Sequence, residues 1–201
     1  MIATNTLAAA GVGIGLHKMD YERVARVGVL SAVFFVASLV HVPIPPASAH
    51  LLLNALMGFL LGWAAFPALA VALLLQAIIF GFGGVTSLGA NVLIMGIPAI
   101  ATHHVFAPRI CPGMSQHRVF ALAFVAGVVG IALTCVMAGV ALFATGKEFT
   151  GPIGMIALGH VPVAAVEGFV TGSAVAFLYR VRPAFLAAPL RAHADKEIRV
   201  G

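Results

Sequence analysis

The sequence predicts an all-α integral membrane protein with about seven transmembrane helices. Hydrophobic residues make up 62% of its 201 residues, charged residues make up only 8%, and the mean hydropathy is +1.11. A soluble domain of this length could not bury so much apolar surface. The 22 glycines fit the same class, because small residues let neighbouring transmembrane helices approach closely.

Seven apolar runs define the expected helices. They lie at 2–16, 27–42, 51–66, 67–82, 88–105, 119–144 and 154–179. The first run is short for a bilayer core, which needs about 20 residues, but the chain start lacks the basic region and cleavage site of a signal peptide. The uncharged stretch 51–82 is either one very long helix or two short ones. Pro67 disfavours helix at the residue before it, so we expect a turn at Phe66–Pro67.

The basic residues predict how the chain is oriented. With the N-terminus outside and a turn at Phe66–Pro67, ten of the eleven lysines and arginines fall on the cytoplasmic side and only Lys147 falls outside. The net charge of +5 therefore reflects membrane topology rather than nucleic-acid binding. We expect a polytopic domain over 1–183 in the cell's plasma (inner) membrane, with a polar cytoplasmic tail over 184–201.

One segment on the predicted outer side combines histidines with prolines. Residues 40–54 read V-H-V-P-I-P-P-A-S-A-H-L-L-L-N, and the prolines predict a stiff, extended connector. His41 and His50 are nine residues apart, which matches no helical face, so only the shape of the loop can bring them together. Imidazole is a common ligand of Ni²⁺, Co²⁺, Cu²⁺ and Zn²⁺. The alternative is that both histidines cap or solvate the loop.

Four polar residues within or beside the apolar runs are further candidates. Asn91, next to the Gly-rich segment 83–90, either bonds to the 41–50 loop or closes its own turn. Gln76 in the middle of a run is typical of hydrogen bonding between helices. Glu167 is the only acidic residue inside a run, and His160 precedes it by two helical turns on the same face. We expect a structural role at a helix interface for these two.

The sequence gives no indication of an enzyme. It contains no H-E-x-x-H motif, no G-x-S-x-G motif with partners and no Gly-rich phosphate loop with a lysine. Cys111 and Cys135 have no CxxC spacing and are predicted to be neither ligands nor a disulfide. If the protein takes part in active transport, partner subunits must hydrolyse the ATP.

Three motifs, in order, carry a family resemblance: H-V-P-I-P-P-A-S-A-H, then Q-A-I-I-F-G-F-G-G-V-T-S-L-G-A-N, then G-H-V-P-V-A-A-V-E-G-F-V-T-G. Over about residues 1–183 the chain resembles the CbiM/NikM family, the substrate-capture membrane subunits of energy-coupling-factor transporters for cobalt and nickel. The resemblance implies seven helices, a metal site near the outer face and a link to cobalamin synthesis. It also implies partners: a transmembrane coupling protein, ATP-binding subunits and a small accessory membrane subunit.

The resemblance also implies the ligands of the transported Co²⁺ or Ni²⁺. In the family, the N-terminal amine, the adjacent histidine with its backbone nitrogen, and a histidine that matches His50 take the metal. His41 remains a second candidate ligand, and Ser48 and Asn91 would support the site. This chain departs from the family by beginning Met-Ile-Ala rather than Met-His-Ile. Either the true start lies about ten residues upstream, which we favour, or the chain is a divergent member that binds metal weakly or not at all.

Two other functions are compatible with the sequence. A vitamin-capturing subunit of the same transporter type is disfavoured, because each outer loop has at most one aromatic residue for stacking an organic ring. A structural or assembly subunit without a substrate remains possible because the N-terminal ligands are absent. Cobalt and nickel share ligands and geometry, and the sequence does not separate them.

Overall fold

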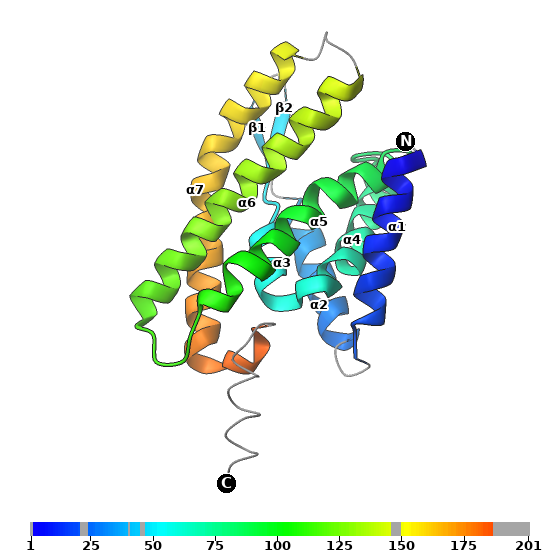
Figure 1. Ribbon diagram of the computed structural model, residues 1–201. Coiled ribbons are helices and arrows are strands. Elements are labelled where there is room, and N and C mark those ends of the chain that lie inside the picture. The colour runs from blue at the N-terminus through cyan, green and yellow to red at the C-terminus, as the bar shows by residue number, and fades with distance from the viewer. Residues whose placement is uncertain (1, 21–23, 40, 45–46, 146–149, 187–201) are drawn as a thin grey trace.

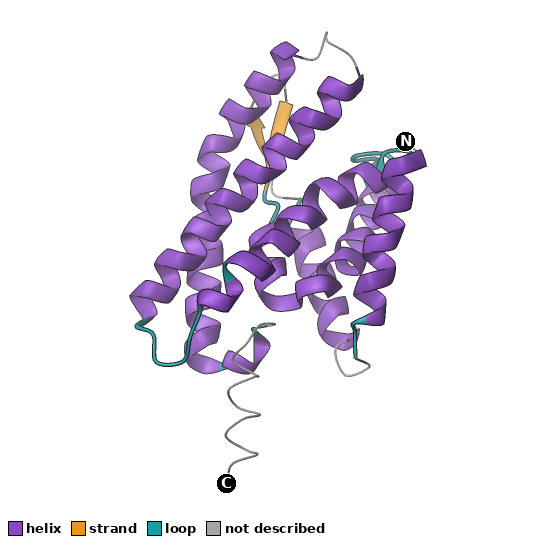
Figure 2. Ribbon diagram, in the orientation of Figure 1, coloured by secondary structure: helices purple, strands orange, loops and turns teal. Residues whose placement is uncertain are grey.

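Helices form almost all of the structure, a computed structural model that describes residues 2–20, 24–39, 41–44, 47–145 and 150–186. Figure 2 shows a short hairpin as the one β-structure in this part of the chain. The elements, shown in Figure 1, are α1 (Ile2–His17), α2 (Val24–Ala37), β1 (His41–Ile44), β2 (Ala47–His50), α3 (Asn54–Leu61), the 3₁₀ turn η2 (Gly62–Ala64), α4 (Ala65–Ile79), α5 (Leu88–Val105), η3 (Ala107–Arg109), α6 (Gln116–Thr145), α7 (Thr150–Val181) and η5 (Pro183–Phe185).

The helical prediction is confirmed, whereas the number of membrane crossings stays a prediction. Within the described residues, four stretches are long and apolar enough to span a bilayer: Asn54–Ile79, Leu88–Arg109, Gln116–Ala144 and Gly154–Val181. At 16 and 14 residues, α1 and α2 are shorter than a straight bilayer crossing requires. The predicted tail, 184–201, begins within η5, and Leu186 just after η5 is buried; residues 187–201 lie outside the described part.

The break in the long apolar stretch lies at η2 rather than at Phe66–Pro67, so the predicted position was wrong. Gly62 ends α3 with a φ of 57°, and a Cβ there would lie 2.9 Å from a ring carbon of His103. Both the left-handed backbone and the close approach require glycine. Pro67 instead occupies the first turn of α4, where its missing N–H would have no helical partner in any case.

The loops gather at two ends of the molecule. In Figure 1 the hairpin, the start of α1, and the connection from α4 to α5 lie at the upper end, while the connection from α5 to α6 and the end of α7 lie at the lower end. The described basic residues belong to segments at the lower end: Lys18, Arg26, Arg109, Arg118, Arg180 and Arg182. This grouping is the one that the charge pattern predicts; Lys147 lies outside the described residues.

Two helical layers enclose the core. The long helices α6 and α7 pack against each other along one side, and a Cβ on Gly127 of α6 would lie 2.8 Å from Cα of Gly168 of α7. On the other side α4 lies among α1, α2 and α5. The short α3 is central, and its Phe59 is fully buried. A cavity lies between α4, α5 and the α6–α7 pair.

Candidate metal-binding cavity

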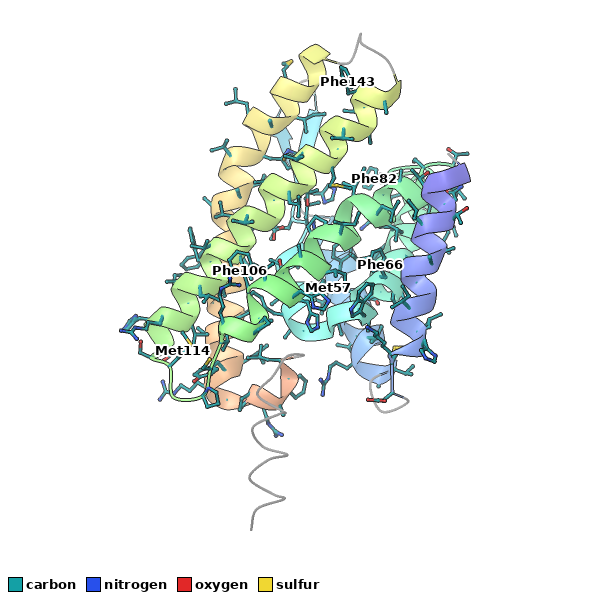
Figure 3. The ribbon with its side chains drawn as sticks, in the orientation of Figure 1. Met57, Phe66, Phe82, Phe106, Met114 and Phe143 are labelled. Atoms are coloured by element: carbon teal, nitrogen blue, oxygen red, sulfur yellow. The ribbon has the colours of Figure 1, made fainter. Side chains whose placement is uncertain are left out.

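A cavity of about 350 Å³ lies where the hairpin meets α4, α5, α6 and α7. Its polar lining residues come from six different segments: Ser38, His50, Gln76, Asn91, Thr134 and His160. Phe82 also lines it and lies toward the upper end in Figure 3, whereas Met57 and Phe66 lie lower in the helical core. Four of the polar residues are therefore ones that the sequence indicated as candidates, and the fold brings them to one cavity.

The histidine-containing loop forms an antiparallel hairpin rather than only a stiff connector. Strand β1 pairs with β2 in a register that places His41 opposite His50 and Pro43 opposite Ser48. A two-stranded hairpin tolerates proline because each strand has an edge that needs no ladder bond. Strand pairing thus brings together two histidines that no helical spacing could. The side chains of His41 and Ser48 lie outside the described part of the structure.

His50 is half-buried at the end of β2 and lines the cavity. Its Nδ1 lies 3.1 Å from the carbonyl oxygen of Leu51. Because a carbonyl oxygen only accepts hydrogen bonds, Nδ1 carries the proton in this bond and Nε2 carries the lone pair. Metal-binding histidines are usually oriented in this way, with one ring nitrogen donating to a backbone or carboxylate oxygen.

Glu167 fixes the segment that follows His50. The carboxyl oxygen Oε1 accepts hydrogen bonds from the backbone N–H groups of Leu52 and Leu53, the latter at 2.7 Å. Leu53 precedes α3, has a φ of 48° and makes no side-chain cap, so a carboxyl group from α7 satisfies backbone donors at the start of α3. Glu167 is only 1% exposed and does not line the cavity. The structure therefore places it at a helix interface, as a support of the loop.

Gln76 and Asn91 make hydrogen bonds beside the cavity. The Gln76 amide donates to the hydroxyl of Ser38, which donates to the carbonyl of Phe35 at 2.6 Å, so the chain of bonds joins α4 to the end of α2. The Asn91 amide donates to the carbonyl of Gly83 at 3.5 Å. Of the two alternatives for Asn91, this is the local bond that closes the glycine-rich turn.

The sequence did not indicate a buried polar pair at the cavity, in which Thr134 lines the cavity and Asn54 lies behind it as its hydrogen-bond partner. Asn54 is 1% exposed and donates to the hydroxyl of Thr134 at 2.9 Å, and Thr134 donates to the carbonyl of Gly130. The amide oxygen of Asn54 has no hydrogen-bond partner among the described residues. Ser38 was missed as well, since small polar residues inside apolar runs carry no signal that distinguishes packing from a site.

The described side chains provide only part of a coordination sphere. In the part of the chain that the structure covers, no group of three or more histidine, cysteine, aspartate and glutamate residues gathers within reach of one ion. The cavity has two histidines, His50 and His160, and its other polar lining groups are neutral amides and hydroxyls. Such a lining suits a borderline transition metal better than Mg²⁺ or Ca²⁺, which prefer carboxylate oxygen.

Comparison with known proteins identifies the family of the chain. The family model described as the cobalt uptake substrate-specific transmembrane region (CbiM) matches residues 1–185. The chain belongs to the CbiM family. It is 35% identical to a putative metal transport protein of Haemophilus influenzae, over 91% of this chain and 89% of that one. It is 32% identical to the cobalt transport protein CbiM of Sorangium cellulosum, over 90% and 87% of the two chains.

Solved structures extend the likeness to three dimensions. The crystal structure of a truncated transition metal transporter matches with a TM-score of 0.67 at 26% identity, over 90% of each chain.

A further sequence relative carries nickel in its name. The fused nickel transport protein NikMN of Rhodobacter capsulatus is 35% identical, and this chain covers 59% of its length. The CbiM-family chain is therefore a multi-pass membrane protein and a membrane component of cobalt or nickel transport.

Proposed function

We propose that this protein is the substrate-binding membrane subunit of an energy-coupling-factor transporter and that it captures Co²⁺ or Ni²⁺ at its outer face. The observation that carries the proposal is His50, which lines the cavity and uses Nδ1 as the donor to the carbonyl of Leu51, so that Nε2 is the ring nitrogen with the lone pair. The cation is the cargo, so the site must both bind it and release it. A neutral lining favours release, because no carboxylate charge holds the divalent cation in the cavity.

The charge distribution supports outward capture. The described lysines and arginines belong to segments at the lower end, which the positive-inside rule assigns to the cytoplasm. The hairpin and the cavity lie toward the opposite end, so the cavity receives the cation from outside. Release to the cytoplasm then requires a conformational change of the whole assembly.

ATP hydrolysis belongs to partner subunits, since the sequence has no phosphate-binding loop. The names of two relatives support such an assembly, because each joins further transporter components in one chain: a putative fused nickel transport protein NikMN and a putative fused cobalt transport protein CbiMQ. We propose a transmembrane coupling protein, ATP-binding subunits and a small accessory membrane subunit as partners within the lipid bilayer.

The cavity argues against the competing substrate class. A vitamin ring would need aromatic stacking surfaces, and Phe82 is the one aromatic residue among the cavity's described lining residues. A purely structural subunit would need neither the lone pair of His50 nor the space beside it. Metal capture explains both features.

Titration calorimetry on the full chain in lipid nanodiscs, purified with a tag that contains no histidine, tests the proposal. We expect binding of Ni²⁺ or Co²⁺ that falls by more than about 100-fold in His50→Gln, since losing even an outer-shell partner typically costs 10–100-fold. The matched control is His117→Gln, because His117 is exposed at the start of α6, at the lower end. Unchanged binding in His50→Gln, or no binding by the wild-type chain, would contradict the proposal.

A further inference from the structure

We propose that His160 of α7 supplies a second imidazole ligand to the transported cation, an assignment that rests on the proposed function. Co²⁺ or Ni²⁺ in the cavity would then be held by one nitrogen from the hairpin and one from α7. The sequence suggested only a structural role for this residue. Its position, its hydrogen bond and the character of its surroundings point instead to a ligand.

The hydrogen bond of His160 sets its tautomer. Nδ1 lies 2.7 Å from the carbonyl oxygen of Ile156, one turn earlier in α7, so Nδ1 is the donor and Nε2 carries the lone pair. The described residues supply no donor to Nε2. In His50, too, Nδ1 is the donor, and it bonds to the carbonyl of Leu51. Two histidines on one cavity thus each hold Nε2 in the state that binds a metal.

His160 borders two different environments. His160 lines the polar cavity, and it also lines an apolar groove of about 510 Å³ between α6 and α7 with Phe124, Ile131 and Cys135. The surface of the groove is almost entirely carbon. His160 therefore stands between a polar cavity and an apolar groove, and of the two only the polar cavity offers further ligands to a cation.

Glu167 links the two segments that carry the histidines. This residue follows His160 by two turns of α7, and its carboxyl group binds the backbone of Leu52 and Leu53, immediately after His50. The helix that carries one imidazole is thus bonded to the segment that carries the other. Such anchoring is what a two-imidazole site needs, because the geometry of a ligand set decides which metal it takes.

The volume of the cavity allows a cation that keeps part of its water. A water molecule occupies about 30 Å³ in the liquid, so about 350 Å³ leaves room for a metal ion with several water ligands. The two imidazoles therefore need not lie in contact with each other. Waters, or further nitrogen ligands from the chain, would complete the coordination sphere.

Replacing His160 by cysteine tests for direct contact. If residue 160 touches the ion, the His160→Cys variant loaded with Co²⁺ in nanodiscs will show a near-ultraviolet thiolate-to-cobalt charge-transfer band, because a coordinating thiol is deprotonated. The matched control is Leu158→Cys, in the same helix but 75% exposed and outside the cavity lining. The wild-type chain, which contains Cys111 and Cys135, gives the baseline.

Affinity measurements separate this inference from the proposed function. We expect His160→Gln to lower Co²⁺ or Ni²⁺ affinity by about 10–100-fold, with the larger loss in His50→Gln. Wild-type affinity in His160→Gln together with no band in His160→Cys would overturn the inference, while loss of binding in His50→Gln alone would leave the proposed function standing. If no metal binds to the wild-type chain, both fail. The charge-transfer band cannot arise from a merely structural residue, so it decides the case even if His160→Gln folds poorly.

Discussion

Removing the carboxyl group of Glu167 should loosen the metal-binding loop although Glu167 does not line the cavity. Its Oε1 accepts from two buried backbone donors, Leu52 and Leu53. Leaving a buried donor unsatisfied costs about 1–3 kcal/mol, so Glu167→Ala should weaken this segment by about 2–6 kcal/mol. Leu53 adds about 1 kcal/mol of left-handed backbone strain, which the segment releases once it is no longer held.

Amide hydrogen exchange measures this effect directly. In Glu167→Ala we expect the Leu52 and Leu53 amides to lose protection and Ni²⁺ affinity to fall, because His50 is only two residues away. Glu167→Gln keeps an oxygen acceptor and should lie between the alanine variant and the wild type. Thr171→Val is the matched control, since Thr171 is buried one turn further along α7 and its hydroxyl has no hydrogen-bond partner among the described residues. Wild-type protection of both amides in Glu167→Ala would refute the reasoning.

Three further predictions follow from the fold and the site. Gly62→Ala should lower stability by about 1–3 kcal/mol, because it combines a left-handed backbone with a clash against His103; equal melting temperatures of variant and wild type would contradict this. Tyr179→Phe should lower the free energy of unfolding by about 1 kcal/mol and speed proteolysis of the α5–α6 connection, because the Tyr179 hydroxyl accepts from the backbone N–H of Met114 and donates to the carbonyl of Cys111. An unchanged cleavage rate would contradict this prediction. Metal affinity should fall as the pH is lowered from about 8 to about 5, because a metal-binding imidazole must be neutral and protons compete with the metal for its nitrogen; a flat calorimetric profile over this range would exclude such a ligand.

Hydropathy predicted the helices well because each apolar run must lie in the core or the bilayer whatever its neighbours are. The position of the break before α4 could not be predicted in this way. Pro67 was the visible signal, but what fixes the turn is the approach of His103 from α5 to Gly62. That contact joins residues from different helices, and a local sequence pattern contains no information about it.

The candidate site was predictable in its residue types but not in its assembly. The prolines correctly excluded a helix between the histidines, yet the register that places His41 opposite His50 depends on strand pairing. The bonds from Glu167 to Leu52 and Leu53 link residues more than a hundred positions apart. The sequence showed the spacing of His160 from Glu167, but its place on the cavity wall depends on how α7 packs against the hairpin.

Anomalous diffraction from crystals of the full chain, recorded at the nickel or cobalt absorption edge, tests the central claim most directly because it locates the ion itself. Metal capture by this cavity predicts one strong anomalous peak within coordination distance of Nε2 of His50, and its loss in His50→Gln. A peak at the lower end of the molecule, for example beside the neighbouring rings of His103 and His104, or no peak in metal-saturated crystals, would contradict the claim.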